Sequence, residues 1–170
     1  MDVRPTSDRL RETLFDILTA GNPAALEGTV WIDFYAGTGA VGIEALSRGA
    51  AMVYFVESAP GAAELIRKNL FALGITSGFQ VLRQDTVRAL QAWDQSGIQA
   101  DFVFLDPPYA METAYGHALT ALSSAAFVLA ETIVIVEHQK KFDPGEQVGE
   151  LKRYRLLKQG DAALSFYRRR

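Results

Sequence analysis

The chain contains no cysteine, and this absence excludes several classes of chemistry. Its 170 residues hold no thiol for a disulfide, an iron–sulfur cluster or a thiolate zinc site. No apolar run approaches the roughly 20 residues that a membrane-spanning helix needs, and the first residues contain no apolar signal-peptide core. Histidine occurs only twice, and no cluster of ligand residues suggests a metal. We therefore expect one cytoplasmic, metal-free domain over residues 1–170.

An overall excess of positive charge is also missing, but one end of the chain is basic. The net charge is −3, which does not by itself indicate nucleic-acid binding. Residues 150–170 contain seven Lys or Arg and two acidic residues, so they carry +5 and the rest of the chain carries −8. This asymmetry predicts an edge that faces a polyanion. The alternative is a solvated C-terminal tail.

Apolar sequence is plentiful and comes in short blocks of two kinds. Helical spacing predicts helices over residues 7–19, 40–48, 60–73, 86–93 and 112–123. Short apolar runs predict strands over residues 29–35, 52–56, 79–82, 101–105 and 132–137, then a hairpin of residues 153–157 and 163–167. Their alternation indicates an α/β, Rossmann-like fold: a mostly parallel seven-stranded sheet, helices on both faces, and an antiparallel C-terminal hairpin.

A glycine-rich turn follows the first predicted strand. Residues 33–42 read Asp-Phe-Tyr-Ala-Gly-Thr-Gly-Ala-Val-Gly and match G-x-G-x-x-G, the dinucleotide-binding fingerprint. Glu57 ends the second strand, where a ribose-binding acid lies in such folds. Glycines let the backbone approach a pyrophosphate and S-adenosylmethionine equally well. The turn therefore leaves both a nicotinamide-dependent oxidoreductase and a methyltransferase open.

Acidic residues at the strand ends favour the methyltransferase. Asp33 lies four residues before Gly37, where a carboxylate would repel a pyrophosphate but attract the ammonium group of a methionine. Asp85 follows the third strand, where it can accept a hydrogen bond from an adenine amine. With Glu57 and Asp106, these acids end four strands at the ligand-binding edge of an open α/β sheet. The alternative is that all four are helix caps or solvated loop residues.

The segment Asp106-Pro107-Pro108-Tyr109 follows the apolar run 102–105. Its prolines donate no N–H and fix φ near about −65°, so they end the strand and leave carbonyl oxygens in fixed positions. One carboxylate, one fixed carbonyl and one flat ring suit a planar base that carries an exocyclic amine. The alternative is a rigid turn with Tyr109 packed in the core.

Further segments, spread over essentially the whole chain, match the sequence pattern of one protein family. They are Arg4-Pro5-Thr6, Asp8, Arg11-Glu12, Val56-Glu57, Asn69-Leu70, Asp85, Glu137-His138 and residues 163–167. With the glycine turn and residues 106–109, they resemble the bacterial 16S ribosomal RNA guanine-N2 methyltransferases of the RsmD type. The resemblance implies a class I methyltransferase fold and methyl transfer from S-adenosylmethionine to N2 of a guanine in 16S rRNA. It also implies S-adenosylhomocysteine as product, a cytoplasmic monomer, and rRNA free or in assembling small-subunit particles as partner.

Residue roles follow from this resemblance. Asp33 would bind the methionine ammonium, Glu57 the ribose hydroxyls, and Asp85 with Thr86 the adenine amine. The remaining cofactor-binding positions would be Tyr35, Ala36, Gly37 and Gly39. The target guanine would meet Asp106, Pro107, Pro108 and Tyr109, and RNA would meet Arg4, Thr6, Arg11, Lys152, Arg153 and Arg168. We expect His117, His138, Trp31 and Trp93 to be structural.

Other functions share parts of this pattern. An adenine-N6 or DNA-directed amino-methyltransferase can use the same D-P-P-Y segment, an oxidoreductase can use the glycine turn, and a non-catalytic RNA-binding or assembly factor can keep the fold. The family usually carries a basic, glycine-containing strand segment before the R-P-T sequence, and this chain begins almost at Arg4. We expect that difference to affect RNA affinity more than cofactor binding.

Overall fold

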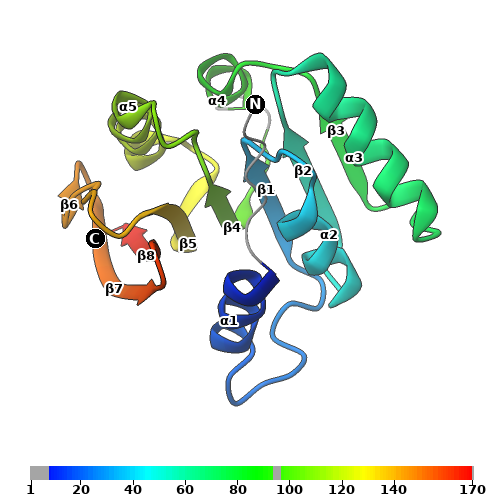
Figure 1. The fold of residues 1–170 in the computed structure, drawn as a ribbon, viewed down its shortest axis with the longest axis horizontal. Helices are drawn as coiled ribbons and strands as arrows, with labels where there is room; N and C mark the ends of the chain where they lie inside the picture. Colours follow the sequence, from blue (N-terminus) through cyan, green and yellow to red (C-terminus); the bar gives the residue numbers. More distant parts are fainter. Residues whose placement is uncertain (1–7, 94–96, 170) are drawn as a thin grey trace.

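The computed structural model describes residues 8–93 and 97–169, which form one twisted sheet covered by helices (Figure 1). The order of the eight strands is β3-β2-β1-β4-β5-β8-β7-β6. The strands are β1 (Val30–Phe34), β2 (Met52–Val56), β3 (Phe79–Leu82), β4 (Ala100–Leu105), β5 (Val128–Gln139), β6 (Gln147–Val148), β7 (Leu151–Gln159) and β8 (Ala162–Arg169). The helices are α1 (Asp8–Leu18), α2 (Ala40–Ser47), α3 (Pro60–Ala72), α4 (Thr86–Trp93) and α5 (Glu112–Ser124).

Strands β1 to β5 are parallel, as the alternation of strands and helices predicts. β1 is central, with Asp33 in register with Phe55 on β2 and with Phe104 on β4. Parallel neighbours need long crossover connections, and the intervening helices supply them. All five strands therefore end at one edge, which we call the carboxyl edge.

The C-terminal strands close the sheet in the antiparallel sense. β8 pairs with β5 and β7 with β8, and the predicted hairpin turns at Gly160, whose φ is +58°. The predicted number of seven strands is wrong, because β6 adds an eighth of two residues, too short to give a periodic signal. β5 also begins four residues earlier than predicted. The pairing of β4 with β5 shifts register between Val128 and Ile133, and within this irregularity the hydroxyl of Thr132 donates to the carbonyl of Ala100.

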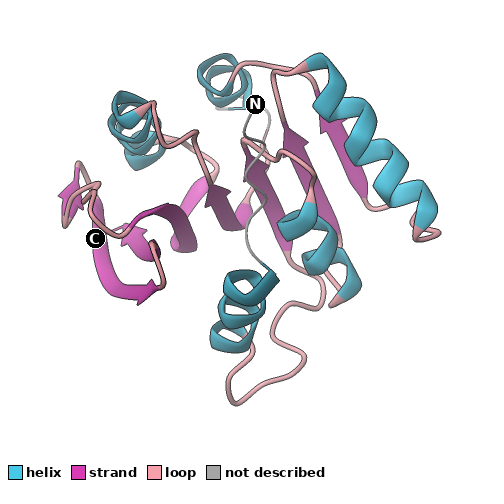
Figure 2. Cartoon of the chain, in the orientation of Figure 1, coloured by secondary structure: helices cyan, strands magenta, loops and turns pink. Residues whose placement is uncertain are grey.

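Two helical layers sandwich the sheet (Figure 2). On one face α1, α2 and α3 pack over a core that contains Phe15 and Trp31. On the other face α4 and α5 pack over a core that contains Trp93 and Leu119. The rings of Phe15 and Phe102 stack on Trp31 at centroid distances of 5.6 and 4.6 Å. The prediction that both tryptophans pack in the core is confirmed.

Helix α1 is a cover for the sheet, as its apolar spacing predicts. Leu10, Leu14 and Phe15 are buried, and the hydroxyl of Thr13 donates to the side-chain carbonyl of Gln159 on β7 at 2.8 Å. The first residue of the helix predicted over residues 7–19 lies outside the described residues. Within the described part of the chain, no helix has the length and apolar character to cross a membrane.

Candidate functional site

The carboxyl edge brings the four predicted acids onto neighbouring strands. Asp33 is the penultimate residue of β1, Glu57 directly follows β2, and Asp106 directly follows β4. Asp85 lies just after β3, at the start of α4. Because β3, β2, β1 and β4 are adjacent and parallel, the four acidic residues lie at or just after neighbouring strand ends along this edge.

Glycine is required at the positions of this turn for different structural reasons. Gly37 and Gly39 have φ of +58° and +82°, a region that only glycine adopts at low cost. A Cβ on Gly37 would meet nothing nearer than the Tyr35 carbonyl oxygen, at 4.0 Å, so the backbone there is open to a ligand. A Cβ on Gly42 would clash with Phe55 and would lie 2.8 Å from Val53. Gly42 therefore serves close packing of α2 on β2.

Asp33 lies inside the turn rather than on its surface. It is 1% exposed, and its Oδ2 accepts a hydrogen bond from the Gly42 amide at 3.2 Å, in the first turn of α2. Burial raises the pKa of Asp33 well above the usual value, and the Gly42 hydrogen bond only partly opposes this shift. Asp33 thus ties strand β1 to helix α2, a structural role that the sequence did not reveal.

Glu57 joins two loops of the carboxyl edge. Its Oε1 accepts from the Gly37 amide at 3.0 Å, and its Oε2 accepts from the Ala59 amide at 3.1 Å. Each carboxylate oxygen has a second lone pair, so this half-buried group can still accept from a ligand hydroxyl. Glu57 therefore fixes the glycine turn against the start of α3.

Tyr35 has the only positive φ among the described non-glycine residues, +57°. Such a conformation costs about 1–3 kcal/mol and concentrates at functional sites. Its hydroxyl is hydrogen-bonded to Thr86, while burial raises the Tyr35 pKa. Asp85 is exposed, and its Oδ2 accepts from the Arg88 amide at 3.3 Å as the cap of α4. The predicted positions 35, 85 and 86 therefore meet at one place.

The D-P-P-Y segment is held from below by a residue that the sequence did not single out. The hydroxyl of Tyr115, which is 1% exposed, lies 3.3 Å from both the Pro107 and the Glu137 carbonyl oxygens. Pro107 is buried, while Asp106 and Tyr109 are half-buried. The fixed carbonyl that the prolines predict thus has a specific support. Tyr115 occupies an apolar-face position of α5, so its spacing indicated only core.

His138 belongs to a buried network beside this segment. Its Nε2 is 2.8 Å from the Ser165 hydroxyl and its Nδ1 is 2.8 Å from the Gln139 carbonyl. Burial lowers the pKa of His138, which favours the neutral ring. The guanidinium of Arg153 lies 3.4 Å from the same Ser165 hydroxyl. The prediction that His138 is structural agrees with these contacts.

The predicted RNA-contacting residues have different surroundings. Arg4 and Thr6 lie outside the described residues. The Arg153 side chain is 9% exposed and forms an ion pair of 2.6 Å with Asp143, which lies in the loop between β5 and β6. Its contact with RNA stays a prediction. Lys152 is exposed on β7, and the guanidinium of Arg168 lies over the ring of Tyr154. Arg11 forms an ion pair with Asp8 on α1.

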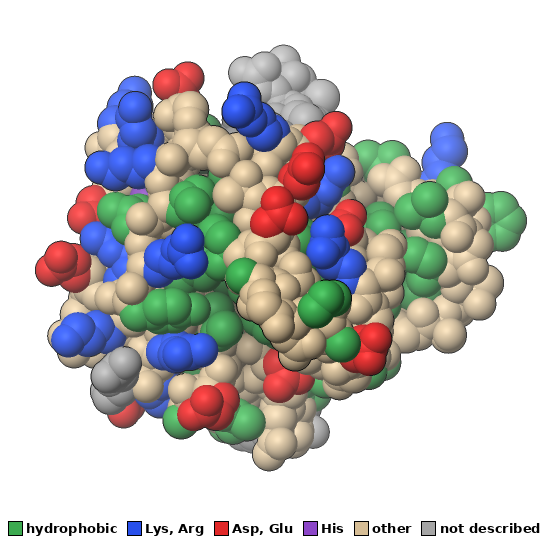
Figure 3. Space-filling model, turned by 90° about the horizontal axis from the view of Figure 1, so that it is seen from below, with side chains coloured by type: hydrophobic (Ala, Val, Ile, Leu, Met, Phe, Trp, Pro, Cys, Tyr) green, Lys and Arg blue, Asp and Glu red, His purple; other side chains and the backbone are tan. Residues whose placement is uncertain are grey.

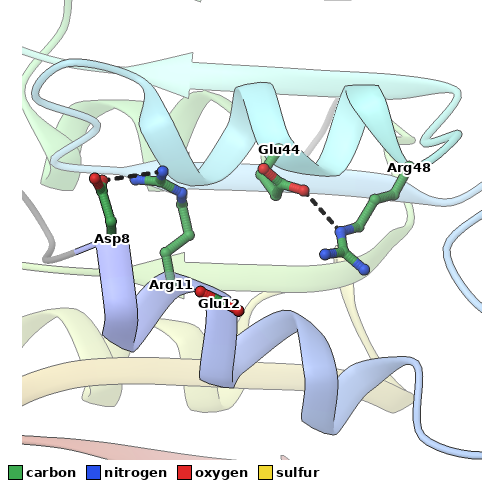
Figure 4. A pocket seen from close by; sticks show the side chains of 5 residues that line it. All are labelled: Asp8, Arg11, Glu12, Glu44 and Arg48. Atoms are coloured by element: carbon green, nitrogen blue, oxygen red, sulfur yellow. Dashed lines mark hydrogen bonds and ion pairs between the residues drawn. The ribbon is translucent and has the colours of Figure 1, made fainter.

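Two cavities lie on the α1–α3 face. The first, of about 220 Å³, is lined by Asp8, Arg11, Glu12, Glu44 and Arg48, and Figure 4 shows these side chains facing one another between α1 and α2. The second, of about 530 Å³, extends from Arg11 past Thr38 to Asn69 and Leu73. The Asn69 amide donates to the Thr38 carbonyl at 3.0 Å, which braces the glycine turn. Neither cavity is lined by the four acids.

Sequence comparison places the chain among known proteins. The family described as "Conserved hypothetical protein 95" matches residues 1–168. The Bacillus subtilis protein YlbH is 32% identical over 98% of this chain and 88% of its own length. The Haemophilus influenzae protein named ribosomal RNA small subunit methyltransferase D is 34% identical over 81% of this chain and 69% of its own length.

Solved structures share the architecture. A conserved hypothetical protein of Streptococcus pyogenes has a TM-score of 0.80 at 27% identity, over 94% of this chain and 95% of that one. The protein SMU.776, solved in complex with SAH, has a TM-score of 0.73 at 11% identity, over 94% of this chain and 48% of that one. At that identity the likeness concerns the fold alone. The match over residues 1–168 and the identity to YlbH and to methyltransferase D establish that this chain belongs to the RsmD-type methyltransferase family.

Proposed function

We propose that this protein transfers the methyl group of S-adenosylmethionine to the exocyclic N2 amine of a guanine in 16S rRNA, the guanine-966 type by resemblance. The observation that carries the proposal is the alignment of Asp33, Glu57, Asp85 and Asp106 on four adjacent strands at the carboxyl edge. Open α/β sheets bind their ligands at this edge. The relatives named as ribosomal RNA methyltransferases support RNA as substrate.

The surroundings of the carboxyl edge fit the cofactor. Glu57 keeps lone pairs for ribose hydroxyls while it holds the Gly37 amide. Asp85 is exposed and can accept from an adenine amine, with Thr86 and Tyr35 beside it. Gly37 leaves the backbone open to the ligand, and Ala36 beside it is half-buried. Gly39 is buried against Ile66 and Phe55, where an added Cβ would lie 3.2 Å from Ile66, so it serves the shape of the turn. Asp33 is buried, so we assign it first to the shape of the turn and second to the charge that the methionine ammonium meets.

When bound, S-adenosylmethionine supplies an electrophilic methyl group whose sulfur leaves with the bonding electrons. The guanine amine is a weak nucleophile, because its lone pair is delocalised into the ring. Hydrogen bonds from this amine to the Asp106 carboxylate and to the Pro107 carbonyl favour a tetrahedral nitrogen. The methylated nitrogen then carries a positive charge and releases one proton, which the Asp106 carboxylate would accept and pass to solvent. Tyr115 keeps that carbonyl in place, and Pro108 and Tyr109 complete the segment, with the Tyr109 ring stacking on the base. Most of the rate gain would come from alignment of the two reactants.

The Asp106→Asn variant tests this assignment. We expect methylation of 16S rRNA to fall about 100-fold, in the range seen when one transition-state hydrogen bond is removed. Binding of S-adenosylmethionine, measured by calorimetry, should stay within about twofold of wild type, and Asp16→Asn on the exposed side of α1 is the control. Turnover at the wild-type rate in Asp106→Asn would refute the mechanism.

The substrate is tested separately. Labelled S-adenosylmethionine should transfer its methyl group to 16S rRNA or small-subunit particles from cells that lack the activity, and mapping should find N2-methylguanine. Labelling of DNA but not RNA would favour an adenine-N6 or DNA-directed enzyme instead. Binding of NAD without affinity for S-adenosylmethionine would favour an oxidoreductase, and cofactor binding without transfer would favour an assembly factor.

A further inference from the structure

The antiparallel end of the sheet presents a group of basic and aromatic side chains, three of them exposed and the fourth, Arg168, half-buried. Figure 3 shows Lys and Arg side chains gathered around hydrophobic ones on the left, where Figure 1 draws β7 and β8. Lys152, Tyr154 and Arg155 come from β7 and Arg168 from β8. We call these four residues the basic-aromatic face.

Among the described residues, three of these side chains are cations for which no acidic partner is found. The arginines held in ion pairs elsewhere in the described chain are Arg11, Arg48, Arg67 and Arg153. Within residues 8–93 and 97–169, Lys152, Arg155 and Arg168 form no ion pair. Their charge is therefore directed to solvent or to a partner. In a protein of net charge −3, this local excess makes an anionic partner favourable.

The centre of the face is a flat, preformed surface. The Arg168 guanidinium carbon lies 4.8 Å from the centroid of the Tyr154 ring, and the Phe166 ring supports the Tyr154 ring at 6.1 Å. Tyr154 remains 44% exposed, so its ring is accessible to a ligand. Aromatic rings and guanidinium planes are the surfaces on which unpaired bases stack. An acidic protein partner would use the charges but not this flat pair.

The strand register relates the face to the D-P-P-Y segment. Lys152 is in register with Arg168, so the two side chains leave the same side of the sheet. On β5, Val136 is in register with Leu105 of β4, and Val134 is in register with Tyr167 of β8. Asp106 is therefore level with the residue after Val136, and Arg168 is level with the residue before Val134. The two residues are about four positions apart along the strands and two strands apart, roughly 15 Å at the usual sheet spacings. A few nucleotides of single strand can span this distance.

We propose that the basic-aromatic face binds single-stranded RNA that flanks the target base, with a base stacked at Tyr154 and Arg168 and phosphates paired with Lys152 and Arg155. This inference rests on the proposed function for the identity of the RNA, but the binding itself does not require catalysis. Arg153 takes no part, because its guanidinium is held by Asp143.

Affinity for a fluorescent oligoadenylate, measured by anisotropy at several salt concentrations, tests the face. Tyr154→Ala should weaken binding about 5- to 100-fold, as loss of one stacked base does, and should leave the salt slope unchanged. Tyr154→Phe should bind like wild type. Arg155→Gln should reduce the slope of log affinity against log salt by about 0.7, as expected for one lost phosphate contact. The control is Lys68→Gln, an exposed position on α3, and it should change neither the affinity nor the salt slope.

Other results would overturn the inference. Unchanged affinity in Tyr154→Ala excludes the stacking site, and competition by poly-glutamate as strong as by oligoadenylate indicates an acidic protein partner. S-adenosylmethionine affinity should be unchanged in every variant, which shows that the fold is intact. If wild type methylates rRNA while Tyr154→Ala keeps the wild-type KM for rRNA, the inference about the basic-aromatic face is refuted and the proposed function stands. If oligoadenylate binding depends on Tyr154 but wild type transfers no methyl group, the proposed function is refuted and the inference about the basic-aromatic face stands.

Discussion

Burial gives Asp33 a chemistry that differs from that of the other acids at the carboxyl edge. Its carboxylate is nearly enclosed and holds a helix amide, whereas Asp85 is exposed and caps α4. Desolvation disfavours the charged form, so the raised pKa of Asp33 means that ionisation works against folding. A ligand ammonium near Asp33 would reverse that effect.

The first prediction concerns pH and Asp33. Because its folded-state pKa lies above the ordinary value of 3.8, its stabilising contribution is complete below that value and is lost as pH rises through the folded-state pKa. Asp33→Asn keeps an acceptor for the Gly42 amide without a charge. We expect the variant to lack this decline and to exceed wild type in free energy of unfolding at pH 7. Urea denaturation from below pH 3.8 up to about pH 8 measures this, and parallel curves for the two proteins would contradict it.

The second prediction compares two glycines. Ala at position 42 would press its Cβ against Phe55 and Val53, so Gly42→Ala should destabilise the fold by about 1–3 kcal/mol. Gly61 lies in α3 with no atom within 4 Å of an added Cβ, so Gly61→Ala should stabilise by about 0.5–1 kcal/mol. Equal effects of the two substitutions in chemical denaturation would show that the close packing of α2 on β2 is unimportant.

At the scale of elements, the last strand also anchors a helix end. Arg169, near the end of β8, donates through Nη2 to the carbonyl oxygens of Ser123 and Ala125 at 2.9 and 3.0 Å. These carbonyls lie at the C-terminus of α5, where backbone acceptors have no partner within the helix. Arg169 therefore supports the helix that positions Tyr115 beneath the D-P-P-Y segment.

The third prediction follows from this anchor. Arg169→Met should lower the free energy of unfolding by about 1.5–3 kcal/mol, the usual range for hydrogen bonds to a charged group. Lys158→Met, at an exposed position on β7, should change the free energy of unfolding by less than about 0.5 kcal/mol. Thermal unfolding of both variants gives the comparison. A stability loss confined to Lys158→Met would be incompatible with the anchoring role.

At the scale of the molecule, the central strands should be the last to open. β1, β4 and β5 each have neighbours on both sides and are covered by both helical layers, whereas β3 and β6 are the edges of the sheet. The fourth prediction is that amides of β1, β4 and β5 exchange with solvent only through global unfolding. Amides of β3 and β6 should exchange through local opening at lower free energy. Hydrogen exchange followed by mass spectrometry tests this, and equal protection across the sheet would count against it.

The sequence by itself determined the order of the elements, the parallel half of the sheet and the common edge of four acids. These depend on local apolar periodicity and on the rule that parallel strands end together. Only the tertiary structure decided the burial of Asp33, the support of Pro107 by Tyr115, the pairing of Arg153 with Asp143 and the existence of β6. Each of these arises from contacts between segments that local periodicity does not relate, so no pattern within one segment encodes it. The same reason applies to the basic-aromatic face, which needs β7 and β8 to be placed side by side.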